Sequence, residues 1–302
     1  MRSPVDHRRG VVGMVIVTLL WSTAGVVSRQ LESASTFEVT FWRSLFTALT
    51  LAVVCGWRDG RRVPALLWQG GPVLWLSGVL WSVMFTCFMV AITLTTVANV
   101  LVTMSVSPLV TALLAHFMLR QRVSGGTWVA IVVAGAGIAW MVGRGVSAHP
   151  EDLLGTLVAL AVPVVAAMNW NLIRRSGAQL DLVPALLIGA VLSALVTAPL
   201  AWPFSASAHD VGLLAGLGIF QLALPCILAV GVAKLLSAPE VALLSLLEII
   251  FGIALAWLWA DERPSADVLW GGSVVLTTLV VNEGWALWRS RRVRSNPVIA
   301  GD

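Results

Sequence analysis

The sequence has few charged residues and no tyrosine. Charged side chains occupy 11% of its 302 positions, whereas hydrophobic residues make up 58%. So few ionic groups cannot cover the surface of an ordinary soluble domain, and a lipid bilayer must therefore act as the solvent. Apolar runs of about 20 residues, enough to cross a hydrocarbon core of about 30 Å, recur between Val11 and Trp288. Such runs are expected to be helices, because a helix satisfies its own backbone hydrogen bonds in lipid.

The sequence also lacks the patterns of common catalytic sites. It has no HExxH, GxSxG or P-loop motif that would place a metal, a nucleophile or a nucleotide. Its three cysteines, Cys55, Cys87 and Cys226, lie in apolar stretches without metal-type spacing, which is typical of small packing residues. We therefore expect neither an enzyme nor a bound metal or cofactor. ATP hydrolysis is not expected either, because the sequence shows no sizeable soluble segment to carry it.

Ten apolar segments are candidate membrane spans, which predicts an all-α integral membrane fold. Their approximate ranges are 11–28, 37–55, 72–93, 97–119, 126–143, 154–173, 183–203, 211–233, 239–259 and 267–288. The first run is interpreted as a helix rather than a signal peptide, because it is long enough to span the bilayer and carries Trp21 at its centre. Residues 94–96 and the region around Ser237 and Pro239 are so short that the flanking helices must form tight hairpins. Counts of nine or eleven helices are the alternatives.

Basic residues are distributed unevenly between alternate loops. With a cytoplasmic N-terminus, the inner segments hold 15 of the 19 basic residues, the outer segments hold Arg29, Arg144 and Arg263, and Arg43 falls within a span. Because loops rich in positive charge stay in the cytoplasm, residues 1–10 and 289–302 are predicted to be cytoplasmic tails. The net charge of +4 is therefore explained by orientation in the membrane and does not indicate nucleic-acid binding.

The two halves of the chain carry a similar charged turn at an offset of about 141 residues. Residues 119–124 (LRQRVS) align with residues 260–265 (ADERPS), and the same register places Ser107 and Pro108 opposite Glu248 and Ile249. Five spans per repeat, an odd number, give the two copies opposite orientations, which agrees with a basic inner turn and an acidic outer turn. We therefore predict two inverted five-helix repeats, over 11–143 and 154–288. Such symmetry offers two similar conformations that open to opposite faces of the membrane.

Four segments carry a family resemblance. Leu19–Ser22 (LLWS) and Phe41–Leu45 (FWRSL) look like a first helix and an arginine-bearing second helix, and Ser107–Leu114 (SPLVTALL) looks like a fourth helix. Leu247 and Glu248, followed by Asp261–Ser265 (DERPS), are similar to a ninth helix and its following turn. Over residues 11–288 the chain thus resembles the EamA-type members of the drug/metabolite transporter superfamily. The resemblance implies ten helices, a central cavity and import or export of metabolites, whose diversity leaves the substrate unnamed.

Two positions depart from the pattern of that family. Gln121 stands where the family usually has an acidic residue, and Ile249 replaces the proline that commonly follows the glutamate of the ninth helix. The second departure puts a proline-dependent kink at Glu248 in doubt, whereas neither departure affects the expected fold.

Glu248 is one of two charged residues expected deep in the membrane. It lies about ten residues from either end of the predicted ninth helix, near the bilayer midplane, where an ionised carboxylate costs at least about 2.5 kcal/mol. The side chain must therefore face the protein interior or water. One hypothesis is that it couples transport to protons or receives a cationic group of the substrate. The alternative is a protonated carboxyl that forms a hydrogen bond between helices.

Arg43 is the other intramembrane charge, six residues from the outer end of the predicted second helix, or about 9 Å deep at the helical rise per residue. It could extend its side chain outward to the membrane surface. Alternatively, it attracts a carboxylate or phosphate of the substrate, or neutralises Glu248 in one conformation. Together with Glu248 it would suit a zwitterion such as an amino acid.

Uncharged polar residues and tryptophans within the spans are further candidates. Asn99, Asn169, Asn171 and Gln221 either join helices through hydrogen bonds or contact a ligand. Trp21 and Trp81 lie near mid-span, where they either pack against neighbours or form cavity walls that stack on a flat or cationic ligand. Other tryptophans fall near predicted span ends, which is typical of an interfacial belt: Trp57, Trp68, Trp128, Trp202, Trp259, Trp270 and Trp288.

These features favour a secondary transporter in the cytoplasmic (inner) membrane that moves a small metabolite or drug by alternating access. We expect export, with amino acids or related metabolites as the favoured substrates and the proton as a candidate coupling ion. A non-transporting scaffold or receptor and an intramembrane enzyme are the alternatives. In a scaffold, Glu248 and Arg43 would be dispensable. A channel is disfavoured, because no filter-like segment is evident.

Overall fold

The computed structural model describes residues 4–120, 123–148, 152–176, 182–232, 235–236 and 238–295. These residues form helices and connecting turns, and no strand occurs among them. Gln121, Lys234 and Ser237, which bear on the predicted turns, lie outside the described residues. The elements are α1 (Pro4–Ser28), α2 (Thr36–Asp59), η1 (Gly60–Arg62), α3 (Val63–Gln69), α4 (Gly71–Leu94), α5 (Val97–Met104), α6 (Ser107–Leu119), α7 (Gly125–Ala148), α8 (Asp152–Ser176), α9 (Leu182–Thr197), α10 (Ala208–Gly216), η2 (Leu217–Ala223), α11 (Leu224–Val232), α12 (Ala238–Ser245), α13 (Leu247–Trp259) and α14 (Ala266–Ser295).

Seven helical stretches of the described chain are long and apolar enough to cross a membrane. Residues 125–141 and 183–197 form two shorter apolar helices, and α14 covers the tenth predicted span. Each predicted span thus coincides with a helix or a succession of helical segments, while ten crossings stay a prediction. The stretches are Asp6–Ser28, Thr36–Gln69, Gly71–Leu94, Val97–Met118, Asp152–Ile173, Ala208–Val232 and Glu240–Trp259.

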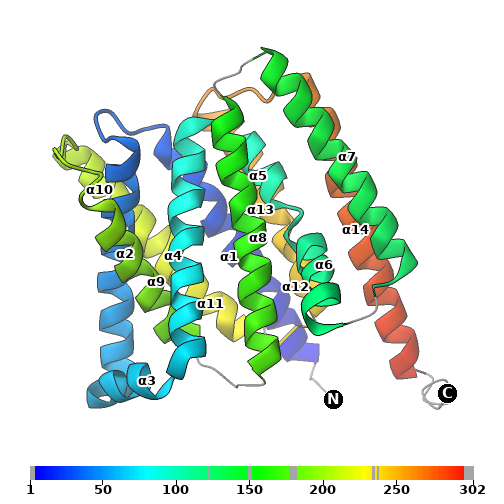
Figure 1. The fold of residues 1–302 in the computed structure, drawn as a ribbon, viewed down its shortest axis with the longest axis horizontal. Coiled ribbons are helices and arrows are strands. Elements are labelled where there is room, and N and C mark those ends of the chain that lie inside the picture. Colours follow the sequence, from blue (N-terminus) through cyan, green and yellow to red (C-terminus); the bar gives the residue numbers. More distant parts are fainter. Residues whose placement is uncertain are drawn as a thin grey trace.

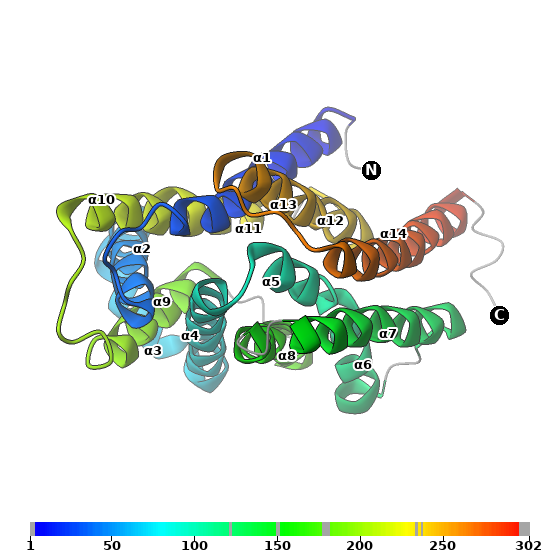
Figure 2. The ribbon, with the colours of Figure 1, turned by 90° about the horizontal axis from the view of Figure 1, so that it is seen from above.

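The helices pack as a bundle whose two sides are formed by different parts of the chain. α1, α12, α13 and α14 lie along one side and α4, α8 and α7 along the other, with α5 between them (Figure 2). α1 packs on α13 and α11, α4 packs on α8 and α9, and α7 pairs with α14. The first turns of α1 and the last turns of α14 lie at the same end of the bundle (Figure 1).

Two of the predicted spans are interrupted near their middle. The span predicted at 97–119 divides into α5 and α6 at Ser105 and Val106, and the span predicted at 239–259 divides into α12 and α13 at Leu246. Pro108 in the first turn of α6 explains the first break, because proline has no backbone N–H to continue the helix. The second break occurs although Ile249 stands at the corresponding position. There, Ile249 donates its N–H to the Leu246 carbonyl at 3.2 Å, a tighter three-residue spacing.

The seventh predicted span is shorter than expected. The sequence predicts a helix over 183–203, but α9 ends at Thr197 and residues 198–200 form a turn. Pro199 gives the reason, because proline cannot donate an N–H and disfavours helical geometry in the residue before it. The prediction is therefore wrong by six residues at this end.

The tryptophans assigned to an interfacial belt lie on the outside of the bundle. All seven expose more than a third of their surface, and Trp57 and Trp68 expose 90% and 89%. Amphipathic indole rings favour the boundary between lipid and water, so these exposures fit the predicted belt.

Candidate functional site

Glu248 lies at a helix break inside the bundle. It is the second residue of α13, directly after the interruption at Leu246, and its side chain is partly buried. The first N–H groups of a helix lack intrahelical partners and carry a partial positive charge, so this position favours a negative group. No ion pair joins Glu248 to Arg43 in the described residues. The predicted neutralisation of Glu248 by Arg43 is therefore absent from this conformation.

Arg43 is buried rather than extended toward the surface. It exposes 1% of its surface, and its guanidinium carbon lies 5.5 Å from the centroid of the Phe88 ring. Within the described part of the chain, Nε and Nη1 have no hydrogen-bond partner. The outward extension considered from the sequence is therefore wrong for this conformation, because an extended side chain would place the guanidinium in water.

Cys226 on α11 is buried in a cluster against which Trp21 packs. Its sulfur experiences the charges of both Arg43 and Glu248, and it forms a hydrogen bond with the side chain of Trp21. Gln221 on η2 donates its side-chain N–H to the Trp21 carbonyl at 3.2 Å, while its Oε1 is buried without a partner in the described residues. The side chain of Cys226, whose sequence pattern indicates only packing, is thus bonded to Trp21 and experiences the charges of Arg43 and Glu248, while Gln221 is bonded to the backbone of Trp21.

The segment that carries Gln221 has unusual helical geometry. Residues 217–223 form a π-helix between α10 and α11, a geometry found frequently at functional sites. Gly218 in this segment packs so close to α2 that a Cβ there would lie 2.7 Å from the Arg43 carbonyl oxygen. The π-helical turn thus brings Gln221 and the backbone of Arg43 into one region.

Trp21 and Trp81 border the same buried cluster. Both side chains are partly buried and pack against a core that includes Phe85 and Cys226. The Trp81 and Phe85 rings lie 5.5 Å apart, and the Trp81 indole nitrogen is buried without a partner among the described residues. These contacts agree with packing, and the partly exposed ring surfaces leave the cavity-wall hypothesis as a prediction.

The three asparagines join neighbouring segments. Asn169 accepts a hydrogen bond from Ser77 on α4 at 2.7 Å, and Asn171 donates to the Thr111 carbonyl on α6 at 3.2 Å. Asn99 donates to Thr95 within the α4–α5 connection at 3.0 Å. Hydrogen bonds between segments therefore account for one of the two polar atoms of each side-chain amide. The other atom is buried without a partner in the described chain.

Two buried carboxylates that were not predicted from the sequence tie loops together at one end of the bundle. Asp210 accepts hydrogen bonds from the backbone N–H groups of Glu32, Ser33 and Ala34 at 2.9 to 3.1 Å. Glu38 accepts from the N–H groups of Ser205 and Ala206. Both acids are fully buried: Asp210 joins the α1–α2 connection to the first turn of α10, and Glu38 joins α2 to the α9–α10 connection, in each case more than 160 residues away.

A salt bridge adds a third connection at this end. Arg29, after the end of α1, places Nε 2.8 Å from Oε2 of Glu262, which lies in the connection before α14. The same guanidinium donates to the carbonyls of Ile92 and Thr95, and Glu262 accepts the N–H of Val97 at the start of α5. At the opposite end, His7 Nε2 lies 3.0 Å from Glu240 Oε1.

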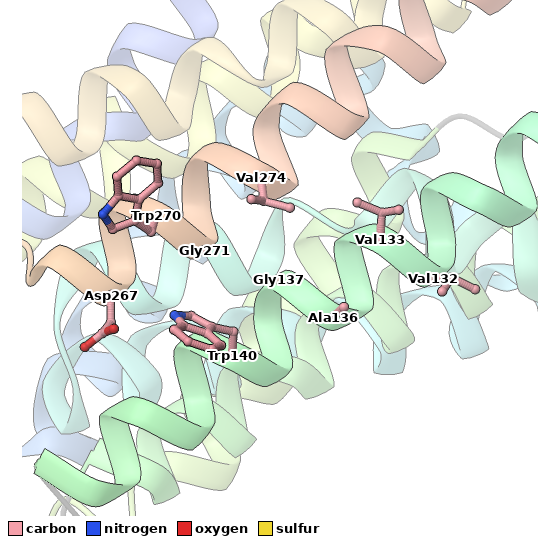
Figure 3. A pocket seen from close by; sticks show the side chains of 9 residues that line it. All are labelled: Val132, Val133, Ala136, Gly137, Trp140, Asp267, Trp270, Gly271 and Val274. Atoms are coloured by element: carbon pink, nitrogen blue, oxygen red, sulfur yellow. The ribbon is translucent and has the colours of Figure 1, made fainter.

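A separate groove of about 640 Å³ lies between α7 and α14 (Figure 3). The helices meet at Gly137 and Gly271, where a Cβ on Gly271 would lie 2.8 Å from the Gly137 carbonyl oxygen. None of the predicted site residues lines this groove. Its walls are apolar apart from Asp267 and the two indole nitrogens: Val132, Val133, Ala136, Gly137, Trp140, Asp267, Trp270, Gly271 and Val274.

One family model matches two successive segments of the chain. A model of the EamA-like transporter family matches residues 8–143 and 153–282. The chain is 24% identical over 275 residues to a pseudopaline exporter of Pseudomonas aeruginosa, covering 89% of this chain and 94% of the exporter. It is 23% identical over 280 residues to an S-adenosylmethionine uptake transporter of Rickettsia conorii, covering 88% of this chain and 90% of that transporter.

A solved structure shares the fold. A crystal structure of a protein with 19% sequence identity superposes with a TM-score of 0.64 and covers 95% of this chain and 99% of that one. The helical arrangement is thus the same at a level of identity that carries no functional detail.

Proposed function

We propose that this chain, which belongs to the EamA-like transporter family, is a secondary transporter that moves a small metabolite or drug across the cytoplasmic membrane by alternating access. The observation that carries the proposal is the pair of interrupted helices, α5–α6 and α12–α13, with Glu248 directly after the second break. Secondary transporters bind substrate and coupling ion at discontinuous helices near the bilayer midplane.

The proposal includes two inverted five-helix repeats over 11–143 and 154–288. Correspondences at an offset of 141 residues support it: α5 with α12, the first residue of α7 with that of α14, and the break at Ser105 with that at Leu246. Arg120 and Asp261, which this offset also pairs, have φ angles of 53° and 50° and are the two non-glycine residues with positive φ in the described chain. The two blocks of the family match divide the chain at nearly the same place.

The conformation supports closure at one end. Asp210, Glu38 and the Arg29–Glu262 pair each join the first proposed repeat to the second at the end opposite the first turns of α1. With both termini in the cytoplasm, as the distribution of arginines predicts, these connections close the outer face. Alternating access then requires them to break when the transporter opens outward.

Relatives guide the choice of substrate and direction. Their names include an exporter and an uptake transporter, and S-adenosylmethionine contains the amino acid methionine. We propose export, with amino acids or related metabolites as substrates, and Glu248 as the group that couples transport to protons or receives a cationic group of the substrate.

The experiment compares bacteria that express the wild type, Glu248→Gln or Glu32→Gln at equal membrane levels. Growth is measured against toxic amino-acid analogues, nucleoside analogues and cationic drugs. Export predicts resistance to one chemical class, and uptake would produce hypersensitivity. The phenotype should vanish in Glu248→Gln and persist in Glu32→Gln, because Glu32 is exposed in the α1–α2 connection.

Two results would count against the proposal. If Glu248→Gln kept the growth phenotype of the wild type with the same pH dependence, the role of Glu248 in proton coupling would be refuted. If cells that express the wild type grew like cells with the empty vector against every class of toxic compound, the result would favour a non-transporting scaffold.

A further inference from the structure

The groove between α7 and α14 has a polar end and an apolar end. Asp267, Trp270 and Trp140 lie at one end, whereas Val132 and Val133 lie toward the other (Figure 3). Trp270 follows Asp267 at a spacing of three residues, so both side chains lie on the same face of α14. A ligand that fills this groove therefore carries a polar group at one end and an apolar body.

The polar end of the groove lies at a boundary of the membrane. Asp267 is in the first turn of α14, and this turn lies at the end of the bundle opposite the first turns of α1 (Figure 1). With both termini in the cytoplasm, it is the outer boundary. From Asp267 to Val274 the groove follows α14 for about 10 Å at the helical rise per residue, which stays within one half of a hydrocarbon core of about 30 Å.

The walls of the groove are open to the bilayer. Trp140 and Trp270 expose 57% and 73% of their surface, and Val132 exposes 68%. These residues lie in the fifth and tenth predicted spans, where an apolar side chain on the outside of the bundle contacts acyl chains rather than water. The groove thus lies where one leaflet of the bilayer can fill it.

Asp267 determines which headgroup suits the polar end. Its carboxylate is half-buried beside the two indole rings (Figure 3). An ammonium group is attracted both by a carboxylate and by the face of an indole ring, whereas a headgroup with a net negative charge is repelled. Because a carboxylate accepts several N–H groups at once, it can bind an ammonium in addition to any partner on the protein.

A second copy of the chain suits the groove less well than a lipid. In a twofold dimer the same surface patch meets itself. An interface centred on the groove would therefore bring two Asp267 carboxylates together in an apolar contact without a cation, which is costly. A phospholipid instead supplies the cation and the apolar chain in one molecule, and it keeps its headgroup at the depth of Asp267.

We propose that this groove binds a phospholipid of the outer leaflet whose headgroup carries a primary ammonium, as that of phosphatidylethanolamine does. The ammonium binds the Asp267 carboxylate beside Trp140 and Trp270, and the indole N–H of Trp270 donates to the phosphate. One acyl chain follows the apolar walls past Ala136 and supports the pairing of α7 with α14. None of the candidate substrate residues lines the groove, so the inference goes beyond the proposed transport function.

The test counts the lipids that stay bound to the purified protein in native mass spectrometry, so it is independent of transport. Delipidated protein in a neutral detergent is titrated with phosphatidylethanolamine or with phosphatidylglycerol of identical acyl chains. We expect the first phosphatidylethanolamine to bind about fivefold more tightly than the first phosphatidylglycerol, because only the former brings an ammonium. A photoreactive group on its acyl chain should crosslink to α7 or α14.

Matched variants locate the headgroup and the chain. Asp267→Asn should remove the preference for phosphatidylethanolamine. Asp261→Asn should keep it, because this variant removes the same charge from an exposed turn before α14, and asparagine tolerates the positive φ there. Ala136→Phe fills the groove and should weaken binding of both lipids, whereas Ala139→Phe, at an exposed position outside the groove, should leave both unchanged.

Four results would overturn the proposal. They are equal affinity of the wild type for the two lipids, an unchanged preference in a folded Asp267→Asn, equal effects of Ala136→Phe and Ala139→Phe, and a dimer that excludes lipid from the groove. The last result would assign the groove to a second copy of the chain. The comparison of headgroups uses the wild type, so it remains decisive even where a variant fails to fold.

Discussion

Gly218 provides the sharpest test of how the candidate site is held together. A Cβ at this position would lie 2.7 Å from the Arg43 carbonyl oxygen, 2.8 Å from Phe46 Cβ and 3.0 Å from the Thr47 backbone nitrogen. All three atoms are backbone or Cβ atoms, so none can rotate away. Ordinary contact begins at 3.4 Å, and Gly218→Ala therefore forces η2 and α2 apart by about 0.7 Å.

The cost of this separation can be isolated with a second glycine. Overpacking of a well-packed interior costs about 1–3 kcal/mol, whereas alanine gains up to about 1 kcal/mol over glycine in a helix. A Cβ added to Gly216 would meet nothing within 4 Å, so Gly216→Ala receives the gain without the clash. The difference in unfolding free energy between the two variants is therefore expected to be about 1–3 kcal/mol.

Thermal unfolding of both purified variants in the same detergent measures this difference. Gly218→Ala should unfold below the wild type and below Gly216→Ala, because only the Gly218 substitution forces η2 away from the backbone of α2. Equal melting temperatures for the two variants would refute the close approach of η2 to α2.

Three further changes test other contacts. Asp210→Asn places an amide nitrogen or a single oxygen before several N–H donors, and it should cost about 3 kcal/mol of unfolding free energy; a melting temperature equal to the wild type would contradict the buried network. Glu262→Gln weakens the ion pair with Arg29, so a membrane-impermeant thiol reagent added outside the cell should label a cysteine inside the bundle faster than it does without this substitution. An unchanged labelling rate would show that the pair does not help to close the outer face. Gly271→Ala should separate α7 from α14 and lower the melting temperature, whereas Gly135→Ala, with open space around it, should keep or raise it, because alanine is the better helix former; equal effects would contradict the close helix crossing.

Hydropathy located the helices well, because a run of about 20 apolar residues has few alternatives to a helix in lipid. It could not locate the break at Leu246, since the residues on both sides are apolar and the position corresponding to Pro108 is Ile249. Hydropathy also could not predict the π-helical turn at residues 217–223, because this segment is apolar throughout most of its length. Both features depend on packing against other helices, and the local sequence carries no mark of them.

The candidate site was predictable in part. Their positions in the spans predict that Arg43 and Glu248 lie deep in the membrane, but depth does not determine the direction of a side chain. The sequence therefore left open whether Arg43 reaches the surface, and the structure shows it buried. Asp210 could not be identified from the sequence, because its backbone partners lie 176 to 178 residues away along the chain.

The most direct test of alternating access is the accessibility of position 248 from each side of the membrane. Glu248→Cys is made in a background in which Cys55, Cys87 and Cys226 are replaced by alanine, and a membrane-impermeant thiol reagent is applied to right-side-out and to inverted vesicles. Ile250→Cys is the control, because Ile250 exposes 52% of its surface on the outside of the bundle. The account predicts that Glu248→Cys reacts from both sides, faster from the cytoplasmic side, and that Ile250→Cys reacts from neither. Labelling of Glu248→Cys from neither side, or from one side alone, would contradict it.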